Sequence, residues 1–315
     1  MARAFAAPVL SERLYAARWC YVFMLPSFGL AILFTFWPIA ASWYFSLLDW
    51  SGFSDERPYI GLANYVELIG DPYFWQAFGR SFLFMAVTVP VRLTLALIVA
   101  IVLNDAALRL APLFRTLFFL PVVTTSAIVG LLMVFVLSPF NGPVNQALVA
   151  SGLVGRPIDF LGDPATALYT VMGVSVWKQF GVSMVYWLAA LQTVPPEQLD
   201  AARVDGAGRW DLLRYITLPH LRPFAIVIVL ITAVSALRVF DLVQTMTGGG
   251  PFFASEVMEV YIYRNAFSVQ GGTPRLGYAS AAGVLFGLTV MLIALTQARA
   301  LRWARQARGD AGLRQ

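Results

Sequence analysis

The stretch VPPEQLDAARVDGAGRWDLLRYITLPHLRP, residues 194–223, interrupts a chain that is otherwise strongly apolar. It carries four charged residues between Glu197 and Asp205 and lies between two long apolar runs. Pro195 and Pro196 end the run before it. Glu197 then falls in the first turn of a new helix, where an acidic side chain favours the positive end of the helix dipole. The stretch therefore predicts a short polar helix between two apolar ones.

A glycine follows this short helix, which is expected to run to about Val204. Gly206 can adopt a positive φ and turn the chain at little steric cost. A second helix, Arg209–Ile216, is then expected to end before Pro219, because proline restricts the residue before it. The pattern predicts a helix–turn–helix that lies along a membrane surface.

Two small residues in the first helix favour a protein contact. Ala201 and Ala202 would let another protein approach the backbone closely, and Arg203, Asp205 and Arg209 could pair with charges around that contact. The alternative is an ordinary charged loop without a partner.

The composition places the rest of the chain in a membrane. Of 315 residues, 59% are apolar and only 12% are charged, and the mean hydropathy is +0.72. A soluble protein of this length would carry roughly twice that charge. Six apolar windows approach the length that a membrane-spanning helix needs; they are approximately Trp19–Phe45, Ser81–Leu103, Leu117–Leu137, Ala167–Leu191, Phe224–Val239 and Tyr278–Ala298. Pro223 is expected in the first turn of the fifth.

Arginines indicate how these spans are oriented. Fourteen of the 22 basic residues fall in the N-terminal arm, in alternate loops or in the C-terminal tail: Arg3, Arg13, Arg18, Arg109, Arg115, Arg203, Arg209, Arg214, Arg222, Arg299, Arg302, Arg305, Arg308 and Arg314. Because cytoplasmic loops are enriched in Lys and Arg, both termini and the polar stretch are predicted to be cytoplasmic. The expected organisation is an arm (1–18), a six-helix domain (19–299) with a loop at 195–220, and a basic tail (300–315). The arginines do not alternate with aromatic residues as in a nucleic-acid groove, so no nucleic-acid partner is expected.

Several kinds of chemistry are missing from the sequence. No Asp or Glu lies within the six windows, whereas ion-coupled carriers commonly place an acid there. There is no phosphate-binding loop, and the only lysine, Lys178, follows no glycine-rich turn. One cysteine, Cys20, and one histidine, His220, exclude a disulfide framework and a protein-only zinc site. We therefore expect no catalysis by this chain, and uphill transport would draw its energy from a partner.

The segment DAARVDGAGRWDLLRYITLP, residues 200–219, resembles the E-A-A-x-x-x-G-x9-I-x-L-P loop of binding-protein-dependent ABC importers. The matching residues are Asp200, Ala201, Ala202, Gly206, Ile216, Leu218 and Pro219, and Asp200 replaces the usual Glu. Four further segments look like the carbohydrate subfamily, in the style of the maltose- and glycerol-3-phosphate-type first permease subunit: YIGLANYVELIGDPYFWQAFGRS (59–81), FRTLFFLPVV (114–123), VWKQFGVSMVYWLAALQTVP (176–195) and FDLVQTMTGGGP (240–251).

This resemblance implies an all-α membrane protein with the type I ABC importer transmembrane fold, in a bacterial inner membrane. It implies a second permease subunit, two ABC ATPase subunits and an extracytoplasmic solute-binding protein as partners. ATP and magnesium would be bound by the ATPase, and no cofactor by this chain. The loop would be the coupling helix seated on the ATPase, through Glu197, Asp200, Ala201, Ala202, Arg203, Asp205, Gly206, Arg209, Ile216, Leu218 and Pro219.

The resemblance also implies that the fourth and fifth spans line a sugar cavity near the bilayer midplane. Polar residues in these spans are the best markers, because each is costly against lipid. The candidates are Ser175, Trp177, Lys178, Gln179, Val182, Ser183, Tyr186, Thr232, Ser235, Ala236 and Arg238. The alternative for any one of them is packing between helices.

Other functions and roles stay open at this stage. The solute could be a polyol or a glycerol-phosphate-type anion, since Lys178 and Arg238 could attract an anionic group. Arg238 could instead pair with Asp241, and Arg92 has no assigned role. A self-sufficient carrier or channel, or a membrane scaffold, are the remoter alternatives. The TGGGP run that ends at Pro251 is expected to form a flexible external turn.

Overall fold

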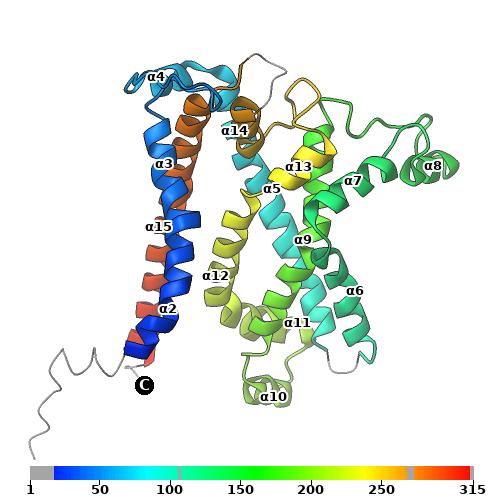
Figure 1. Cartoon of the computed structure of the whole chain (residues 1–315). Coiled ribbons are helices and arrows are strands. Elements are labelled where there is room, and N and C mark those ends of the chain that lie inside the picture. Colours follow the sequence, from blue (N-terminus) through cyan, green and yellow to red (C-terminus); the bar gives the residue numbers. More distant parts are fainter. Residues whose placement is uncertain (1–17, 106–107, 268–272, 313–315) are drawn as a thin grey trace, which may run out of the picture. The chain divides into compact units, whose positions relative to one another are not determined.

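The computed structural model describes residues 18–105, 108–267 and 273–312, and the regular elements of this part of the chain are all helices. Figure 1 shows the elements in order: α2 (Arg18–Ala31), the π-helical η1 (Ile32–Phe36), α3 (Trp37–Phe45), α4 (Ala63–Gly70), α5 (Pro72–Leu103), α6 (Ala111–Val123), α7 (Ser126–Val136), α8 (Pro143–Ala150), α9 (Ala167–Leu191), α10 (Pro196–Val204), α11 (Arg209–Asp211), the π-helical η2 (Leu212–Thr217), α12 (Leu218–Ala236), α13 (Phe240–Met246), α14 (Met258–Phe267) and α15 (Leu276–Gly312).

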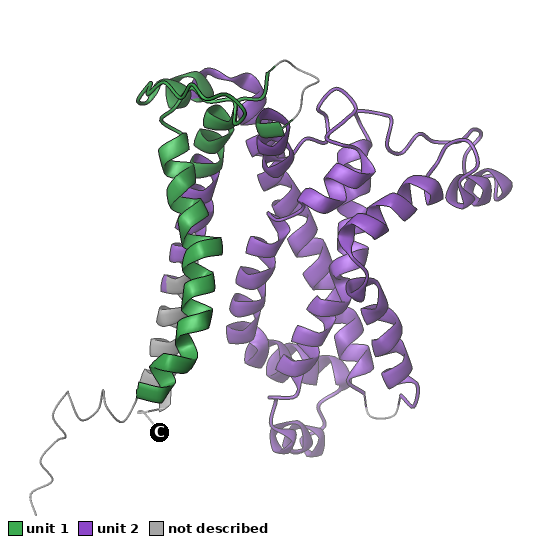
Figure 2. Ribbon diagram, in the orientation of Figure 1, with its two compact units in different colours: residues 1–68, 266–284 green, residues 69–265, 285–315 purple. Residues whose placement is uncertain are grey.

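The chain divides into two compact units (Figure 2). Unit 1 comprises Met1–Leu68 and Ala266–Val284, and unit 2 comprises Ile69–Asn265 and Leu285–Gln315. The expected N-terminal arm, 1–18, lies outside the described residues except for Arg18. The expected tail, 300–315, continues α15 as a helix to Gly312, and residues 313–315 lie outside the described part.

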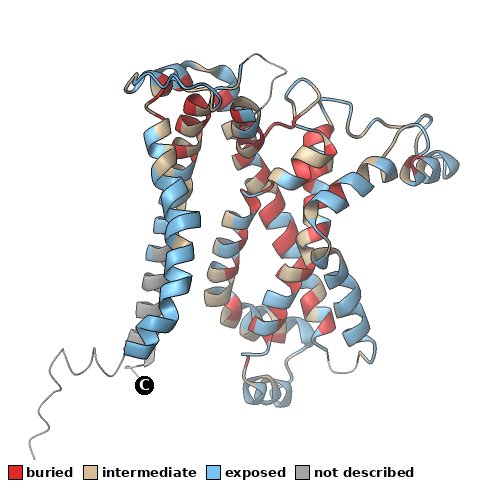
Figure 3. Cartoon of the chain, in the orientation of Figure 1, coloured by how far each residue is buried: buried red, intermediate tan, exposed pale blue. Residues whose placement is uncertain are grey.

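The longest apolar segment of unit 1 is the helix Arg18–Phe45, which a loop connects to α4. The helix Arg18–Phe45 has no buried residue in its most apolar window, and Figure 3 shows it exposed along its length. Such a surface suits lipid rather than water. At its end, the Asn64 side chain donates to the Ser46 and Leu48 carbonyls, both at 2.9 Å.

The core of unit 2 forms where α5 packs along α9. Small residues on α5, Ala96 and Ala100, are fully buried and allow close approach. Trp187 of α9 is buried and donates its indole N–H to the Leu93 carbonyl at 3.1 Å, which satisfies the one polar atom of that ring. This buried seam appears as the red stretch along both helices in Figure 3.

Four helices of the described residues are long and apolar enough to cross a membrane: Arg18–Phe45, Pro72–Leu103, Arg209–Ala236 and Leu276–Thr296. They correspond to the first, second, fifth and sixth expected windows. The fourth expected window, Ala167–Leu191, forms a continuous 25-residue helix, α9. It is not among the four, because its polar side chains lower its hydropathy.

The third expected span, Leu117–Leu137, is wrong as a single straight helix. The helix is interrupted between Val123 and Ser126, and the axes of α6 and α7 are bent by 97° at this point. Thr124 and Thr125 are extended, with ψ of 140° and 146°. Pro121 lacks an N–H and so weakens the last turn of α6 before the break. The pair counts as a fifth span only if the two bent helices are taken together.

The fifth expected span begins earlier than predicted. A 28-residue helix runs unbroken over Arg209–Ala236. The helix expected to end before Pro219 therefore continues through it, and Pro223 lies inside the helix rather than in its first turn. The ring of Pro219 would clash with the carbonyl of Tyr215 in a regular helix. The wider π-helical turns of η2, which include Tyr215, accommodate it.

Candidate functional site

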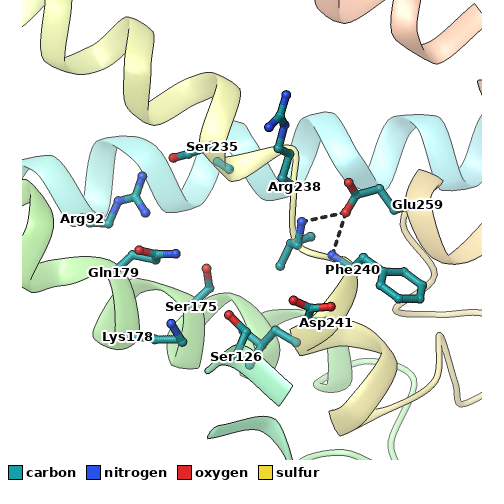
Figure 4. Close-up of a pocket in the computed structure, with 13 residues that line it drawn as sticks. Arg92, Ser126, Ser175, Lys178, Gln179, Ser235, Arg238, Phe240, Asp241 and Glu259 are labelled. Atoms are coloured by element: carbon teal, nitrogen blue, oxygen red, sulfur yellow. Dashed lines mark hydrogen bonds between the residues drawn. The ribbon is translucent and has the colours of Figure 1, made fainter. Parts of the chain in front are cut away.

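A polar pocket of about 170 Å³ lies inside unit 2. Figure 4 shows side chains from several helices around the same space, among them Arg92 from α5 and Lys178 from α9. The lining residues are Arg92, Ser126, Ser175, Lys178, Gln179, Ser235, Ala236, Arg238, Val239, Phe240, Asp241, Leu242 and Glu259.

One wall of the pocket is the break between α12 and α13. Helix α12 ends at Ala236 and α13 begins at Phe240, so the first N–H groups of α13 have no helical partner. Glu259 Oε2 accepts the N–H of Val239 at 2.8 Å and of Phe240 at 2.7 Å. The negative charge of the carboxylate also interacts favourably with the positive end of the helix dipole. Glu259 therefore fixes the geometry of this wall.

Burial raises the pKa of Glu259 above its ordinary value of 4.5. The N–H groups of Phe240 and Val239 and the charge of Arg238 oppose this rise. Desolvation, which penalises the charged form of the carboxyl, is the largest of these effects, so the pKa of Glu259 is raised overall.

Five ionisable side chains line the pocket: Arg92, Lys178, Arg238, Asp241 and Glu259. Of the described residues, no two of these five form an ion pair within 4.0 Å. The alternative pairing of Arg238 with Asp241 is therefore not observed.

Arg92 and Lys178 are the deeply buried cations of this pocket, with 4% and 5% of their surfaces exposed. Arg92 donates to the Thr232 carbonyl over a long 3.4 Å, and its Nε has no partner in the described chain. Arg92, which had no assigned role from the sequence, thus becomes a lining residue.

Six of the predicted pathway residues meet in this pocket: Ser175, Lys178, Gln179, Ser235, Ala236 and Arg238. The three on α9 follow the i, i+3, i+4 spacing of a single helix face.

Five predicted pathway residues are not among those that line the pocket: Trp177, Val182, Ser183, Tyr186 and Thr232. Trp177 is 48% exposed and lies on the opposite side of α9 from Ser175. Tyr186 is 37% exposed; it shares the face of Gln179 but lies about two turns farther along the helix. Ser183 and Thr232 are buried outside the pocket lining. The Thr232 carbonyl accepts the hydrogen bond from Arg92.

Neither acidic residue of the pocket was among the predicted pathway residues, and Asp241 was considered only as a partner for Arg238. Asp241 and Glu259 come from segments outside the six windows, so the absence of acidic residues from the windows does not keep carboxyl groups out of the pocket lining. The position of Asp241, two residues after the fifth window, was the one feature of the sequence that could have indicated an acidic residue near the pocket. Ser126, Val239, Phe240 and Leu242 were also missed, because a broken helix pair cannot be recognised from its hydropathy.

The polar loop forms the short helix that the sequence predicts. Helix α10 carries Glu197 in its first turn and Arg203 in its last. Gly206 has φ of +86°, as expected for the turn, and its N–H donates to the Arg203 carbonyl at 3.1 Å. Asp211 accepts the N–H of Gly208 at 3.1 Å and so caps the helix that follows.

The surface of this loop is largely exposed. Asp200 and Arg203 pair at 2.7 Å, but both are well exposed, so the pair adds little stability. Val204 and Trp210 are 87% and 68% exposed. Ala201, Asp205, Arg209 and Leu218 are exposed, whereas Ala202, Ile216 and Pro219 are partly buried. Within unit 2, Figure 1 places α10 at the opposite end from α13.

The TGGGP run follows α13 and forms a turn. The helix stops at Met246, and Gly248 and Gly249 have φ of +59° and +88°. The hydroxyls of Thr247 and Ser255 are 2.7 Å apart, which ties the two sides of the turn together.

Comparison with known sequences gives the family of the chain. Residues 92–303 match the family described as binding-protein-dependent transport system inner membrane component. A probable ABC transporter permease of Bacillus subtilis, YurN, is 36% identical over 91% of this chain and 97% of its own length. The lactose transport system permease LacF of Rhizobium radiobacter is 33% identical, with 90% and 93% covered. The sn-glycerol-3-phosphate transport system permease UgpA of Yersinia pseudotuberculosis is 29% identical, with 88% and 91% covered.

Solved structures support the same assignment. A chain of a bacterial ABC transporter involved in the import of the acidic polysaccharide alginate superposes with a TM-score of 0.80 at 25% identity, over 93% of this chain and 98% of its own. The alginate transporter in complex with an alginate pentasaccharide-bound periplasmic protein gives 0.79 at 25% identity, with 91% and 95% covered. This all-helical, multi-pass membrane protein belongs to the binding-protein-dependent transport system inner membrane components and is an ABC transporter permease with the type I importer fold.

Proposed function

We propose that this chain is the membrane-spanning subunit of an ATP-driven importer for a carbohydrate or carbohydrate-like solute. The related permeases are named for lactose and sn-glycerol-3-phosphate, and the similar structure imports alginate. Hydroxyl and amide groups such as those of Ser175 and Gln179 suit a solute that is rich in hydroxyls.

One observation carries this proposal: a single helix connects the exposed loop with the pocket. Helix Arg209–Ala236 starts next to α10 and ends with Ser235 and Ala236 in the pocket lining. A movement of the loop would therefore reach the solute site through one continuous element.

In this proposal α10 is the coupling helix that docks on an ATPase subunit. The exposed Val204 and Trp210 offer apolar contact area, and the small Ala201 allows close approach. Two ATPase subunits, a second permease and an extracytoplasmic binding protein complete the transporter. Both termini and α10 face the cytoplasm, following the distribution of arginines.

The test is ATPase activity of the co-purified complex in lipid nanodiscs, with and without its binding protein and a panel of sugars. Gly206→Val should abolish stimulation while assembly persists, because a β-branched residue is strained at a φ of +86°. Gly208→Ala is the control, since its φ of −74° is open to any residue and an added Cβ would meet only the flexible Asp211 carboxylate, at 3.3 Å.

Two results would contradict the proposal. One is that no ATPase co-purifies and the chain alone transports solute in liposomes, which would make it a self-sufficient carrier. The other is that the Gly206 and Gly208 variants behave alike.

A further inference from the structure

The pocket of unit 2 is richer in positive than in negative charge. Three cationic side chains line it, against two carboxyl groups. Arg92 and Lys178 are more than nine-tenths buried and come from two different helices, α5 and α9. Ionised groups are costly to bury unless they are paired and hydrogen-bonded.

Neither buried cation has a full set of partners within the described residues. Arg92 has an unpartnered Nε and one long hydrogen bond to a carbonyl. The ammonium of Lys178 has no hydrogen bond and no ion pair in the same part of the chain. An ammonium carries three donors and a guanidinium five, so both have donors to spare.

The two carboxyl groups of the pocket do not neutralise these cations by contact. Glu259 uses one oxygen to bind two backbone N–H groups of the α12–α13 break. Asp241 forms no ion pair within 4.0 Å with Arg92 or Lys178. The missing counter-charge is therefore best supplied from outside the chain.

On the basis of the importer function proposed above, we infer that the transported solute carries an anionic group, a carboxylate or a phosphate, that binds between Arg92 and Lys178. Ser175 and Gln179 lie on the same face of α9 as Lys178 and would bind neighbouring hydroxyls. The cavity of about 170 Å³ is smaller than the roughly 300–1,000 Å³ of drug-sized ligand pockets, so it suits one acidic sugar unit.

The test measures binding of solutes to the assembled transporter in nanodiscs without its binding protein, so that only the permease site is probed. The probes are galacturonate, a hexose phosphate and neutral galactose, and the first two distinguish a carboxylate from a phosphate. We expect one of the anionic probes to bind at least about tenfold more tightly than galactose. Lys178→Met should weaken binding of the preferred anionic probe by about tenfold and reduce its preference over galactose. Lys178→Arg should retain most of the affinity for the anionic probe.

Arg156→Met is the matched control, because Arg156 is an exposed cation outside the pocket lining. The inference is overturned if galactose binds as tightly as both anions, or if Lys178→Met and Arg156→Met have the same small effect. The preference of the unmodified transporter decides the matter even where Lys178→Met does not assemble. ATPase stimulation by the loaded binding protein is recorded separately, so an importer that accepts neutral sugars is distinguished from a chain that is no importer.

Discussion

Glu259 is the side chain on which the geometry of the pocket most depends. Its carboxylate accepts the N–H groups of Val239, just before α13, and of Phe240, the first residue of α13, at 2.8 and 2.7 Å, although Glu259 itself belongs to α14. Burial nevertheless raises its pKa, so the ionised form that makes these hydrogen bonds is also the form that burial disfavours.

The first prediction concerns the pH dependence of stability. The folded pKa of Glu259 is raised, so its contribution to stability is complete below its ordinary value of 4.5 and is lost as the pH rises through the folded pKa. Glu259→Gln cannot ionise. Between about pH 4 and about pH 8, its unfolding temperature should match that of the unmodified protein at the acid end and exceed it at pH values above the folded pKa of Glu259.

Thermal unfolding in detergent, followed by tryptophan fluorescence across that pH range, measures this difference. Glu56→Gln removes a carboxyl at an exposed position and serves as the control. A constant offset between Glu259→Gln and the unmodified protein at every pH would contradict the prediction.

The second prediction concerns Asn145, which is 2% exposed. Its amide donates to the carbonyls of Leu137, Ser138 and Ile158 at 2.9–3.2 Å and accepts the Ile158 N–H at 2.8 Å. Asn145→Leu should lower the free energy of unfolding by about 1–3 kcal/mol, because buried backbone groups lose their partners. Gln146→Leu, at an exposed neighbour, should change it little, and equal thermal shifts for the two variants would contradict this role.

At the scale of the elements, the close packing of α9 on α6 depends on Gly181. A Cβ atom added there would overlap the Phe118 carbonyl oxygen, whereas one added at Gly173 of the same helix would meet no described atom within 4 Å. Gly181→Ala should therefore destabilise the protein by about 1–3 kcal/mol. Gly173→Ala should be neutral or stabilising by up to about 1 kcal/mol, because alanine favours a helix. Thermal unfolding of both variants decides, and a milder effect at Gly181 than at Gly173 would contradict the packing.

The sequence could predict α10 and its turn because the signals there are local. Pro195, Glu197 and Gly206 each specify one step of the backbone without help from distant residues. It could not predict the continuous helix that crosses Pro219, because a π-helical adjustment depends on packing around it. The bend at Thr124 was hidden for a similar reason: the window is uniformly apolar on both sides of the break.

The pocket shows the same limit. Ser175, Lys178 and Gln179 could be recognised because a polar residue inside an apolar helix is conspicuous. Glu259 could not, because it reaches the pocket from a separate helix, and nothing in its local sequence says which backbone groups it will bind. Trp177, which is adjacent to Lys178 in sequence, does not line the pocket because it lies on the opposite side of α9 from Ser175.

At the scale of the whole molecule, the orientation in the membrane can be tested with single cysteines. Cys20→Ser gives a cysteine-free background. Val204, the last residue of α10, and Phe140, between α7 and α8, are 87% and 88% exposed and suit single cysteines. Figure 1 shows α10 at one end of unit 2, and α7 and α8 toward the other. A membrane-impermeant maleimide applied to intact cells should label Phe140→Cys alone. In inverted vesicles, Val204→Cys should be labelled directly, and Phe140→Cys only after the vesicles are permeabilised. Equal labelling of the two variants in intact cells would contradict the orientation.

Unit 1 is discontinuous in sequence, and this has a consequence for synthesis. Glu67 and Arg275 form a bidentate ion pair, with both N–O distances at 2.6 Å, across a separation of 208 residues. At a translation rate of roughly 5–20 residues per second, about 10–40 s pass between the two residues leaving the ribosome. The first helix must therefore remain in the membrane for that time before the rest of its unit exists. Its largely apolar, exposed surface suits contact with lipid during that time.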